Sequence, residues 1–548
     1  MALMTTATAT ATALTIVIGR ETIAQAAIGC RARRYATAKK KPSVSYDSGI
    51  LNSFKIWYRE MSNYDDGDAF AQDQFLSYVL PYYRPKELVE DKDRAMRAFS
   101  VKTPLRKREE PDLSDSNQWY LNEIRVEKRE TRGTSEKPAE TKHLVMLHGY
   151  GASSGWFYKN YKGIIEGSKR VGNLSIHGLD MIGFGLSGRP NVRFAHDADT
   201  KPSLEIETQG IRWGRYAVCL KCGGHLDGKH STGGHWCSCA AEEEDLRRGV
   251  AAGGGGPASV VVKKEDVYEY VQNQRALVAE AEDVYVESLE RWRAANGIEQ
   301  FDLVAHSLGG YLAVCYVLRY PGRVGRVVLA SPGGVERTPF AVSNPDYARL
   351  GPHDRGTLRM PVSNRVDEYG FLGRYGLTGS VFRLLWRMRV SVFTFLRWLG
   401  PLGPSVLIGR NAAKLARSGN IQDSRELALF LRYVYSCCVR ASFSETSIMR
   451  IFDATVVGKV PVLDKIRDMA PATAAHVCAK DFLWIYGEHD FMYRACGRAA
   501  IEELRRRAHA GPSTPGEYRF RTVANAGHNM YLDNDGAFDR EVIDFLRY

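Results

Sequence analysis

The chain has 548 residues, 44% of them hydrophobic and 25% charged, and its formal net charge at pH 7 is +12. This composition is typical of a globular protein with a sizeable core, and the mean hydropathy of −0.31 argues against a polytopic membrane protein. Half of the net charge lies in residues 1–46, and no RNA- or DNA-reading motif accompanies the mildly basic remainder, so we expect no nucleic-acid partner.

Residues 1–46 are rich in Ala and Thr, contain a single acid, Glu21, and carry most of their basic residues late in the segment. This pattern is typical of a mitochondrial transit peptide rather than of a secretory signal. The run Arg33-Arg34-Tyr35-Ala36 is similar to a matrix-peptidase cleavage site. We expect a location on the matrix side of the inner membrane, where most cysteines stay reduced; the alternative is a disordered basic tail.

Residues 47–118 are of mixed character, with a helical pattern at 70–83, and we interpret them as an N-terminal extension. From residue 119 to 548, short apolar runs alternate with helical or glycine-rich stretches, which predicts one α/β domain with a mostly parallel, doubly wound sheet and helices on both faces. The predicted strands are 119–126, 143–147, 174–179, 301–305, 324–330 and 482–486.

Two blocks interrupt this alternation. The first, 196–258, contains Cys219-x-x-Cys222, Cys237-x-Cys239, interspersed histidines and a run of four glycines. The cysteines suggest zinc, but the second pair departs from the spacing of zinc ribbons and fingers, so we assign no metal and no cofactor. The alternatives are a surface loop or translated non-coding sequence. The second block, 334–469, lies between the strands at 324–330 and 482–486.

The sequence Ala305-His306-Ser307-Leu308-Gly309 matches the nucleophile elbow Gly-x-Ser-x-Gly, with Ala in place of the first Gly. Small residues are needed because the serine occupies a tight turn between a strand and a helix, and a predicted strand and helix flank this motif. A serine hydroxyl also needs a base, and an acid that orients the base. In the α/β-hydrolase fold these follow in the order acid, then histidine, which selects Asp490 and His528. Glu488 is the competing acid.

A tetrahedral intermediate needs hydrogen-bond donors for its oxyanion. The backbone N–H groups of Leu308 and Tyr150 are the expected donors, and we interpret His148 as a residue that braces the loop. His528 and Asp533 also form an HxxxxD spacing, which in some acyltransferases activates an acceptor hydroxyl; an ordinary helix N-cap is the alternative for Asp533.

Several motifs in this order resemble one branch of the α/β-hydrolases, which holds the fungal mitochondrial cardiolipin-specific deacylase, lysophosphatidic acid acyltransferases and N-acyl phospholipid lipases. The resemblance covers residues 119–548 except the first block, and it implies a helical lid at 334–469. One member of the branch is a lipase coactivator without the serine, so Ser307 indicates an enzyme. The motifs are HGYGA from His148, WFYKN from Trp156, DMIGFGLSGRP from Asp180, HSLGGY from His306, YGEHDFM from Tyr486 and GHNMYLDN from Gly527.

The expected lid is strongly basic, since no acidic residue lies between Glu368 and Asp423 while eight basic residues do. Apolar residues recur at helical spacing over 381–399, which predicts an amphipathic helix that lies on an anionic membrane surface. The alternative is a helix packed on the protein's own core. The expected membrane contacts are Arg383, Arg387, Arg389, Arg397, Trp386 and Trp398.

Together these features predict a serine-dependent phospholipid acyl hydrolase that contacts an anionic membrane peripherally, with cardiolipin as the leading substrate. Two alternatives stay open. One is a lysophosphatidic acid acyltransferase, because hydrolysis and transfer share the acyl-enzyme. The other is a non-catalytic lipid-binding regulator of a lipase that keeps the fold. Headgroup, acyl chain and oligomeric state are not specified by these motifs.

Overall fold

The computed structural model describes residues 47–62, 69–85, 95–105, 118–130, 140–196, 259–337, 341–361, 385–386, 388–418, 420–452, 457–511 and 514–548. The predicted transit peptide and all but the first residue of the predicted 196–258 insertion lie outside these ranges. Both therefore stay predictions.

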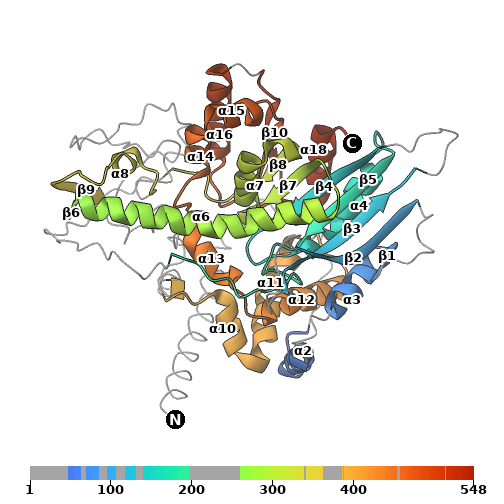
Figure 1. Cartoon of the computed structure of the whole chain (residues 1–548). Coiled ribbons are helices and arrows are strands. Elements are labelled where there is room, and N and C mark those ends of the chain that lie inside the picture. Colours follow the sequence, from blue (N-terminus) through green and yellow to red (C-terminus); the bar gives the residue numbers. More distant parts are fainter. Residues whose placement is uncertain are drawn as a thin grey trace, which may run out of the picture.

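A nine-stranded, mostly parallel sheet forms the centre of the described molecule, as predicted (Figure 1). Only the pairings of β2 with β3 and of β3 with β5 are antiparallel. In spatial order the strands are β1 (Tyr83–Arg84), β2 (Met96–Pro104), β3 (Tyr120–Lys128), β5 (Asn173–Leu179), β4 (Thr141–Leu147), β7 (Phe301–His306), β8 (Val324–Ala330), β10 (Phe482–Gly487) and β11 (Tyr518–Val523).

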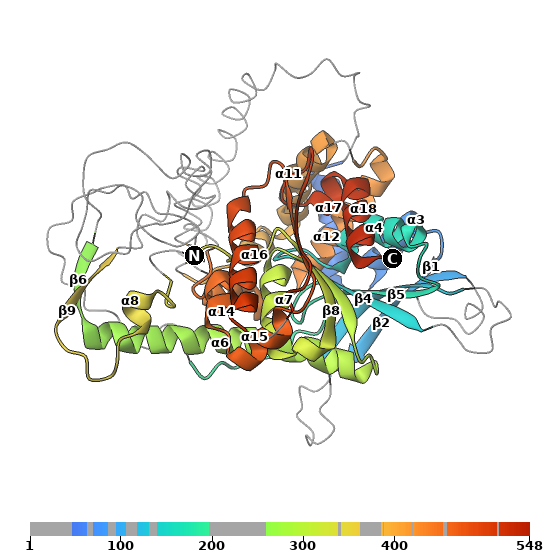
Figure 2. The same ribbon diagram turned by 90° about the horizontal axis from the view of Figure 1, so that it is seen from above.

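Helices cover both faces of the sheet, which is why its inner strands are apolar without alternation (Figure 2). On β4, Leu144 and Met146 face α4 (Tyr158–Gly167) and α18 (Asp535–Leu546). The alternate residues Val145 and Leu147 belong to the opposite core. That second core includes α6 (Lys264–Ala295), α7 (Leu308–Arg319) and α16 (Arg494–His509).

The chain order of the strands reverses between β4 and β7, which lie side by side. In open α/β sheets, ligands bind beyond the carboxyl ends of the strands at such a reversal. The His148 loop leaves the carboxyl end of β4 and Ser307 follows β7, so both lie at this point of the sheet.

Residues 47–118 are not the extension outside the α/β domain that their mixed sequence predicts, and the domain boundary needs correction. Strand β2 pairs with β3 over nine residue pairs, from Met96 opposite Lys128 to Pro104 opposite Tyr120. Two helices from the same region, α2 (Ile50–Ser62) and α3 (Phe70–Val79), pack against α12 (Ser424–Val439). This region is therefore part of the main fold.

The block between β8 and β10 is largely helical in its described part, as expected for a lid. It also contributes strand β9 (Thr357–Pro361), which pairs with β6 (Ser259–Lys263) at the N-terminal end of α6 (Figure 2). Its helices are α8 (Pro345–Ala348), α10 (Val392–Trp398), η7 (Gly400–Leu402), α11 (Gly403–Ser418), α12 (Ser424–Val439), α13 (Ser444–Ile451), α14 (Val462–Asp468) and α15 (Pro471–Val477). The remaining short elements are η3 (Ser154–Phe157), η4 (Pro321–Arg323) and α17 (Met530–Asp533).

A buried carboxylate, Glu123 on β3, ties the sheet to α6. Its oxygens accept hydrogen bonds from Arg125 Nε (2.6 Å), His177 Nδ1 (2.7 Å) and Trp292 Nε1 (3.0 Å). Burial alone would raise the pKa of Glu123. The charges and hydrogen bonds of His177 and Arg125 have the larger, opposite effect and lower this pKa to about 2. Ionised Glu123 is thus held between three donors inside the fold.

We expect Glu123→Gln to lower the free energy of unfolding by on the order of 3 kcal/mol at neutral pH, because partly buried Arg125 loses its counter-charge. The pKa is depressed from its ordinary 4.5, so this contribution is complete above pH 4.5 and is lost as the pH falls from 4.5 towards 2. Urea unfolding at neutral pH and within this acid window measures the difference. Exposed Glu130→Gln is the control, and a difference that did not shrink in acid would contradict this role of the charge.

Candidate active site

Ser307 lies on a tight turn between β7 and α7, with φ of 52° and ψ of −115°. Hydrogen bonds fix this unusual backbone: Ser307 N–H donates to Ala330 O at 3.0 Å, and Ser307 O accepts from Gly333 N–H at 3.0 Å. A side-chain carbon at Gly309 would lie 2.5 Å from the carbonyl oxygen of His148, so this position of the motif requires glycine. Ala305 is fully buried in the core, which therefore accommodates its extra methyl group.

His528 and Asp490 converge on Ser307 from two other loops. His528 Nε2 lies 3.1 Å from Ser307 Oγ, and His528 Nδ1 lies 3.0 Å from Asp490 Oδ1. An imidazole protonated at Nδ1 would donate to Asp490 and accept the hydroxyl proton of Ser307. The structure thus brings the three predicted triad residues into a single hydrogen-bonded chain.

Two further donors hold Asp490. Its Oδ1 accepts from Met492 N–H at 3.0 Å, and its Oδ2 accepts from the hydroxyl of Ser331, which follows β8. Burial raises the pKa of Asp490, but its hydrogen bond to His528, the charge of that ring and these two donors leave the pKa below its ordinary value. Asp490 is therefore held ionised, as an acid that orients a histidine must be.

The structure decides between the two candidate acids. Glu488 points away from His528, and its carboxylate accepts from Asn525 N–H at 2.9 Å. The side chain of His489 is 69% exposed and does not enter the site. Asp490 alone of these neighbours reaches the His528 ring in the described structure.

The loop after β4 lies directly against the nucleophile. A side-chain carbon at Gly149 would lie 2.8 Å from His306 Nδ1 and 2.9 Å from Ser307 Cβ. Among the described residues, the backbone N–H groups of Tyr150 and Leu308 donate to no protein acceptor, so both stay available for an oxyanion. His148 braces the loop as expected, since its Nε2 accepts from Met181 N–H at 3.0 Å and its Nδ1 donates to Gly149 O at 2.8 Å.

Asp533 supports the loop of His528 instead of touching its ring. Its Oδ2 accepts from Gly527 N–H at 2.9 Å, while both ring nitrogens of His528 already face Ser307 and Asp490. Asp533 is not a helix N-cap either: Asn534 caps α18 by accepting from Ala537 N–H. In this chain the Asp of the HxxxxD motif therefore stabilises the turn that carries His528.

Two site residues escaped the sequence analysis. Ser331 lies 24 residues beyond the nucleophile and carries no motif of its own; only its position after a predicted strand could have indicated it. His306 donates from Nε2 to the carbonyl oxygen of His528 at 3.0 Å, and burial together with the charge of His528 holds its pKa well below the ordinary value. His306 is thus a neutral brace for the catalytic loop.

The lid does not form the continuous helix predicted over 381–399. The chain turns at Met388 and Arg389, where Arg389 has a φ of 53°, and α10 begins only at Val392. Ser391 caps α10 by accepting from Thr394 N–H at 3.0 Å.

One of the predicted membrane contacts of the lid, Arg397, is engaged within the protein. Arg397 forms a bidentate ion pair with buried Glu445 of α13, with both N–O distances 2.8 Å, and Trp386 packs partly buried against the core. Arg389 lies half-buried in the turn, whereas Trp398 is 68% exposed. Arg383 and Arg387 lie outside the described residues. Of the four described, Trp398 is largely exposed and the other three are half-buried.

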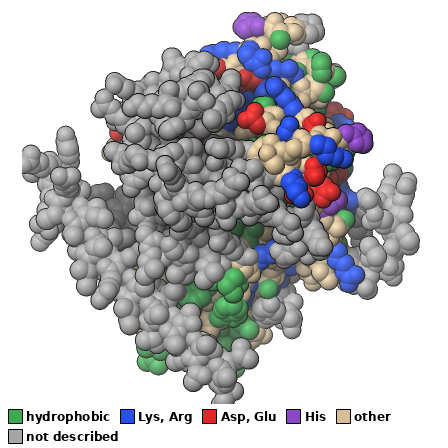
Figure 3. All heavy atoms as spheres, turned by 90° about the vertical axis from the view of Figure 1, so that its left-hand side faces the viewer, with side chains coloured by type: hydrophobic (Ala, Val, Ile, Leu, Met, Phe, Trp, Pro, Cys, Tyr) green, Lys and Arg blue, Asp and Glu red, His purple; other side chains and the backbone are tan. Residues whose placement is uncertain are grey.

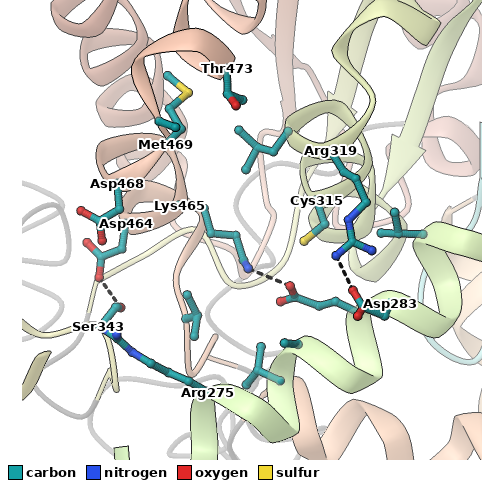
Figure 4. Close-up of a pocket in the computed structure, with 17 residues that line it drawn as sticks. Arg275, Asp283, Cys315, Arg319, Ser343, Asp464, Lys465, Asp468, Met469 and Thr473 are labelled. Atoms are coloured by element: carbon teal, nitrogen blue, oxygen red, sulfur yellow. Dashed lines mark hydrogen bonds and ion pairs between the residues drawn. The ribbon is translucent and has the colours of Figure 1, made fainter. Parts of the chain in front are cut away.

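A cavity of about 520 Å³ lies at the far end of α7 from Ser307, between α6, α7, α14 and α15 (Figure 4). Its charged side chains largely neutralise one another, as in the pairs of Lys465 with Glu282 (2.9 Å) and of Arg319 with Asp283 (2.5 Å). It holds none of the residues around Ser307, so we do not assign the chemistry to it. The described residues contain no cluster of metal-binding side chains.

Comparisons with known proteins agree with this fold. A family model described as alpha/beta hydrolase fold matches residues 142–362. Protein ECM18 of Saccharomyces cerevisiae is 22% identical over 79% of this chain and 75% of its own length. The 1-acylglycerol-3-phosphate O-acyltransferase ICT1 of the same yeast is 22% identical over 78% of this chain and 85% of its own. A (lyso)-N-acylphosphatidylethanolamine lipase of Bos taurus is 26% identical over 48% of this chain and 63% of its own. The chain has the α/β-hydrolase fold and is related to lipid acyltransferases and lipases.

We expect Gly149→Ala to lower kcat/KM for a short nitrophenyl ester by about 100-fold, because the added carbon displaces His306 or Ser307 by a fraction of an ångström or more. Gly409→Ala is the matched control, since no atom beyond its chain neighbours and the adjacent backbone of α11 lies within 4 Å of its added carbon. Steady-state kinetics measure the effect, and circular dichroism checks the fold. Unchanged kinetics in folded Gly149→Ala would show that the loop does not contact the reacting serine.

Proposed function

We propose that this chain is a serine-dependent acyl hydrolase of anionic phospholipids, with cardiolipin as the leading substrate. The observation that carries the proposal is the chain of hydrogen bonds from Ser307 through His528 to Asp490. The kinship with lipid-acting proteins supports a phospholipid ester as the substrate class. The basic lid sequence, with no acid between Glu368 and Asp423, supports an anionic one.

The proposed reaction proceeds in two steps. Ser307 Oγ attacks the ester carbonyl while His528 Nε2 takes its proton, and Asp490 stabilises the imidazolium that forms. The N–H groups of Leu308 and Tyr150 bind the developing oxyanion. As the carbon–oxygen bond of the ester breaks, His528 returns the proton to the leaving lysophospholipid oxygen, and the acyl group stays on Ser307. In the second step His528 takes a proton from water, and the water oxygen attacks the acyl carbon. The bond between that carbon and Ser307 Oγ then breaks, His528 returns the proton to Ser307 Oγ, and the fatty acid leaves.

Acyl transfer to lysophosphatidic acid is the second candidate, and the similarity to the acyltransferase ICT1 favours it. It shares the first step and replaces water by an acceptor hydroxyl in the second. His528 serves as the base in both reactions, and Asp533 positions its loop. The accepting group alone therefore separates the two functions.

We also propose a mitochondrial location, on the matrix side of the inner membrane. The composition of residues 1–46 supports this proposal, and imaging of the full-length chain beside a version without this segment tests it.

We expect purified protein to release free fatty acid and a lysolipid from cardiolipin, and Ser307→Ala to lower this activity by about 10⁶-fold because the triad acts as a unit. Mass spectrometry of the lipid products, with lysophosphatidic acid and an acyl donor offered in parallel, distinguishes the candidates. Free fatty acid indicates hydrolysis and new phosphatidic acid indicates transfer. If folded Ser307→Ala kept near wild-type turnover, the assignment of the nucleophile would be wrong, and if the wild-type protein formed neither product, the regulator hypothesis would replace both.

A further inference from the structure

Helix α2 exposes five of its seven large apolar side chains, while Ile56 packs partly buried against the core. Leu51 is 81% exposed, Ile50 68% and Tyr58 62%, whereas the buried residue of this helix is Ser53. A surface helix in water normally shows the reverse pattern, with apolar residues inward and polar residues outward. The inverted pattern indicates that α2 faces an apolar partner.

The exposed side chains of α2 belong to a larger patch. Of the eleven exposed large hydrophobic residues in the described chain, ten lie on α2, on the turn before α10, or on α10, η7 and α11. Hydrophobic side chains gather at the lower edge of the face in Figure 3, the level at which Figure 1 places α10. We call these ten residues the apolar surface; they are Ile50, Leu51, Phe54, Tyr58, Met61, Met388, Val392, Trp398, Leu402 and Val406.

Hydrogen bonds join the elements of the apolar surface. Ser53 Oγ donates to Pro401 O at 2.5 Å and accepts from Ser405 N–H at 2.8 Å. Ser405 Oγ donates to the carbonyl oxygen of Ser48, just before α2, at 2.6 Å. Buried Ser53 thus anchors α2 on η7 and α11 in an orientation that leaves most of the apolar side chains of α2 exposed.

The composition around the apolar surface fits a lipid membrane. Tryptophan and tyrosine, as in Trp398 and Tyr58, are enriched where proteins meet lipid headgroups. The sequence of α11 contains three basic residues and no acid, and Lys55 of α2 is exposed. No single described helix is long and apolar enough to cross a membrane; α10 and the start of α11 meet such a criterion only together, with a bend of 116° between them. Short, sharply bent apolar helices fit insertion into one face of a bilayer.

We propose that the apolar surface docks this chain on the face of a lipid bilayer that contains anionic lipids. The proposal assigns α2, which the sequence analysis had not connected with lipid, to the same docking unit as the lid. It rests on the proposed function only for the identity of the lipid that reaches Ser307.

Helix α10 links this surface to the active site. Val392 and Trp398 of α10 face outward, while the ring of Phe393 packs against Tyr150, with 5.5 Å between ring centroids. A side-chain carbon at Gly151 would lie 3.0 Å from Phe393 Cζ. Arg397 fixes the other side of α10 on Glu445, whose carbonyl oxygen accepts from Tyr150 Oη at 3.0 Å. Docking therefore places the loop that supplies the Tyr150 N–H close to the membrane surface.

Vesicle flotation of the full chain tests the proposal, with vesicles of phosphatidylcholine alone and of phosphatidylcholine mixed with cardiolipin. We expect wild-type protein to bind the mixed vesicles, and Leu51→Ser combined with Trp398→Ser to weaken this binding at least about ten-fold, because two large apolar side chains no longer enter the lipid. Tyr78→Ser is the matched control, since Tyr78 is the remaining exposed large hydrophobic residue of the described chain and lies on α3, outside the apolar surface. It should bind like wild type.

Hydrolysis of a short soluble ester is measured on the same proteins, and we expect it to be unchanged by either variant. Equal vesicle binding by the double variant and wild type would overturn the proposal, as would a wild-type protein that binds neither vesicle. The proposal would also be overturned if sedimentation showed a wild-type dimer that the double variant no longer forms while its vesicle binding is unchanged. The apolar surface would then be an interface with a second copy of the chain. Vesicle binding needs no turnover, so a protein that binds but hydrolyses no ester would refute the proposed function and leave the docking surface standing.

Discussion

The strained backbone of Ser307 is the constraint on which the rest of the site depends. A non-glycine residue with positive φ costs on the order of 1–3 kcal/mol and persists only where its surroundings impose it. Here two hydrogen bonds hold the backbone of Ser307 in this conformation. One joins its N–H to the carbonyl oxygen of Ala330 in β8, and the other joins its carbonyl oxygen to the N–H of Gly333. The turn lifts the Ser307 hydroxyl above the carboxyl edge of the sheet, where the loops after β4, β10 and β11 meet.

The triad could be predicted from the sequence because its signals are local and ordered. Small residues around Ser307, Asp490 just after an apolar strand, and His528 shortly before the last helix each carry a recognisable pattern, and the fold determines their order. The choice of Asp490 over Glu488 was harder, since the two lie two residues apart in one loop. Only the hydrogen bonds of each carboxylate separate them.

Strands at the edge of the sheet, and contacts between residues far apart in the chain, are harder to predict from the sequence. Strand β11 is half-exposed, with the charged residues Arg519 and Arg521 inside it, so it lacks the apolar run that marks β7 or β10. Glu123 is buried against partners from β5 and α6, and nothing near it in sequence indicates that a carboxylate should be inside. The basic sequence of the lid led to the prediction of Arg397 as a membrane contact for the same reason. Its ion-pair partner, Glu445, lies 48 residues further along the chain.

In the lid, the spacing of apolar residues predicts that a helix is present but not where that helix begins. Apolar residues at helical spacing do mark a helix near residue 395, but the spacing cannot reveal the turn at Arg389 that separates α10 from the preceding chain. The apolar surface is shared with α2, more than 300 residues earlier, and is visible only once the two are folded together. In the lid, Phe393 of α10 packs against Tyr150, whose backbone N–H is one of the two expected oxyanion donors.

The central claim is that Ser307 is an activated nucleophile. The most direct test is to treat the purified protein with a fluorophosphonate and to locate the adduct by peptide mass spectrometry. We expect a single adduct on Ser307 that forms rapidly in the wild-type protein and is lost in His528→Ala, because the hydroxyl reacts only when the imidazole accepts its proton. A well-folded wild-type protein that stays unlabelled, or one labelled at another residue, would contradict the claim.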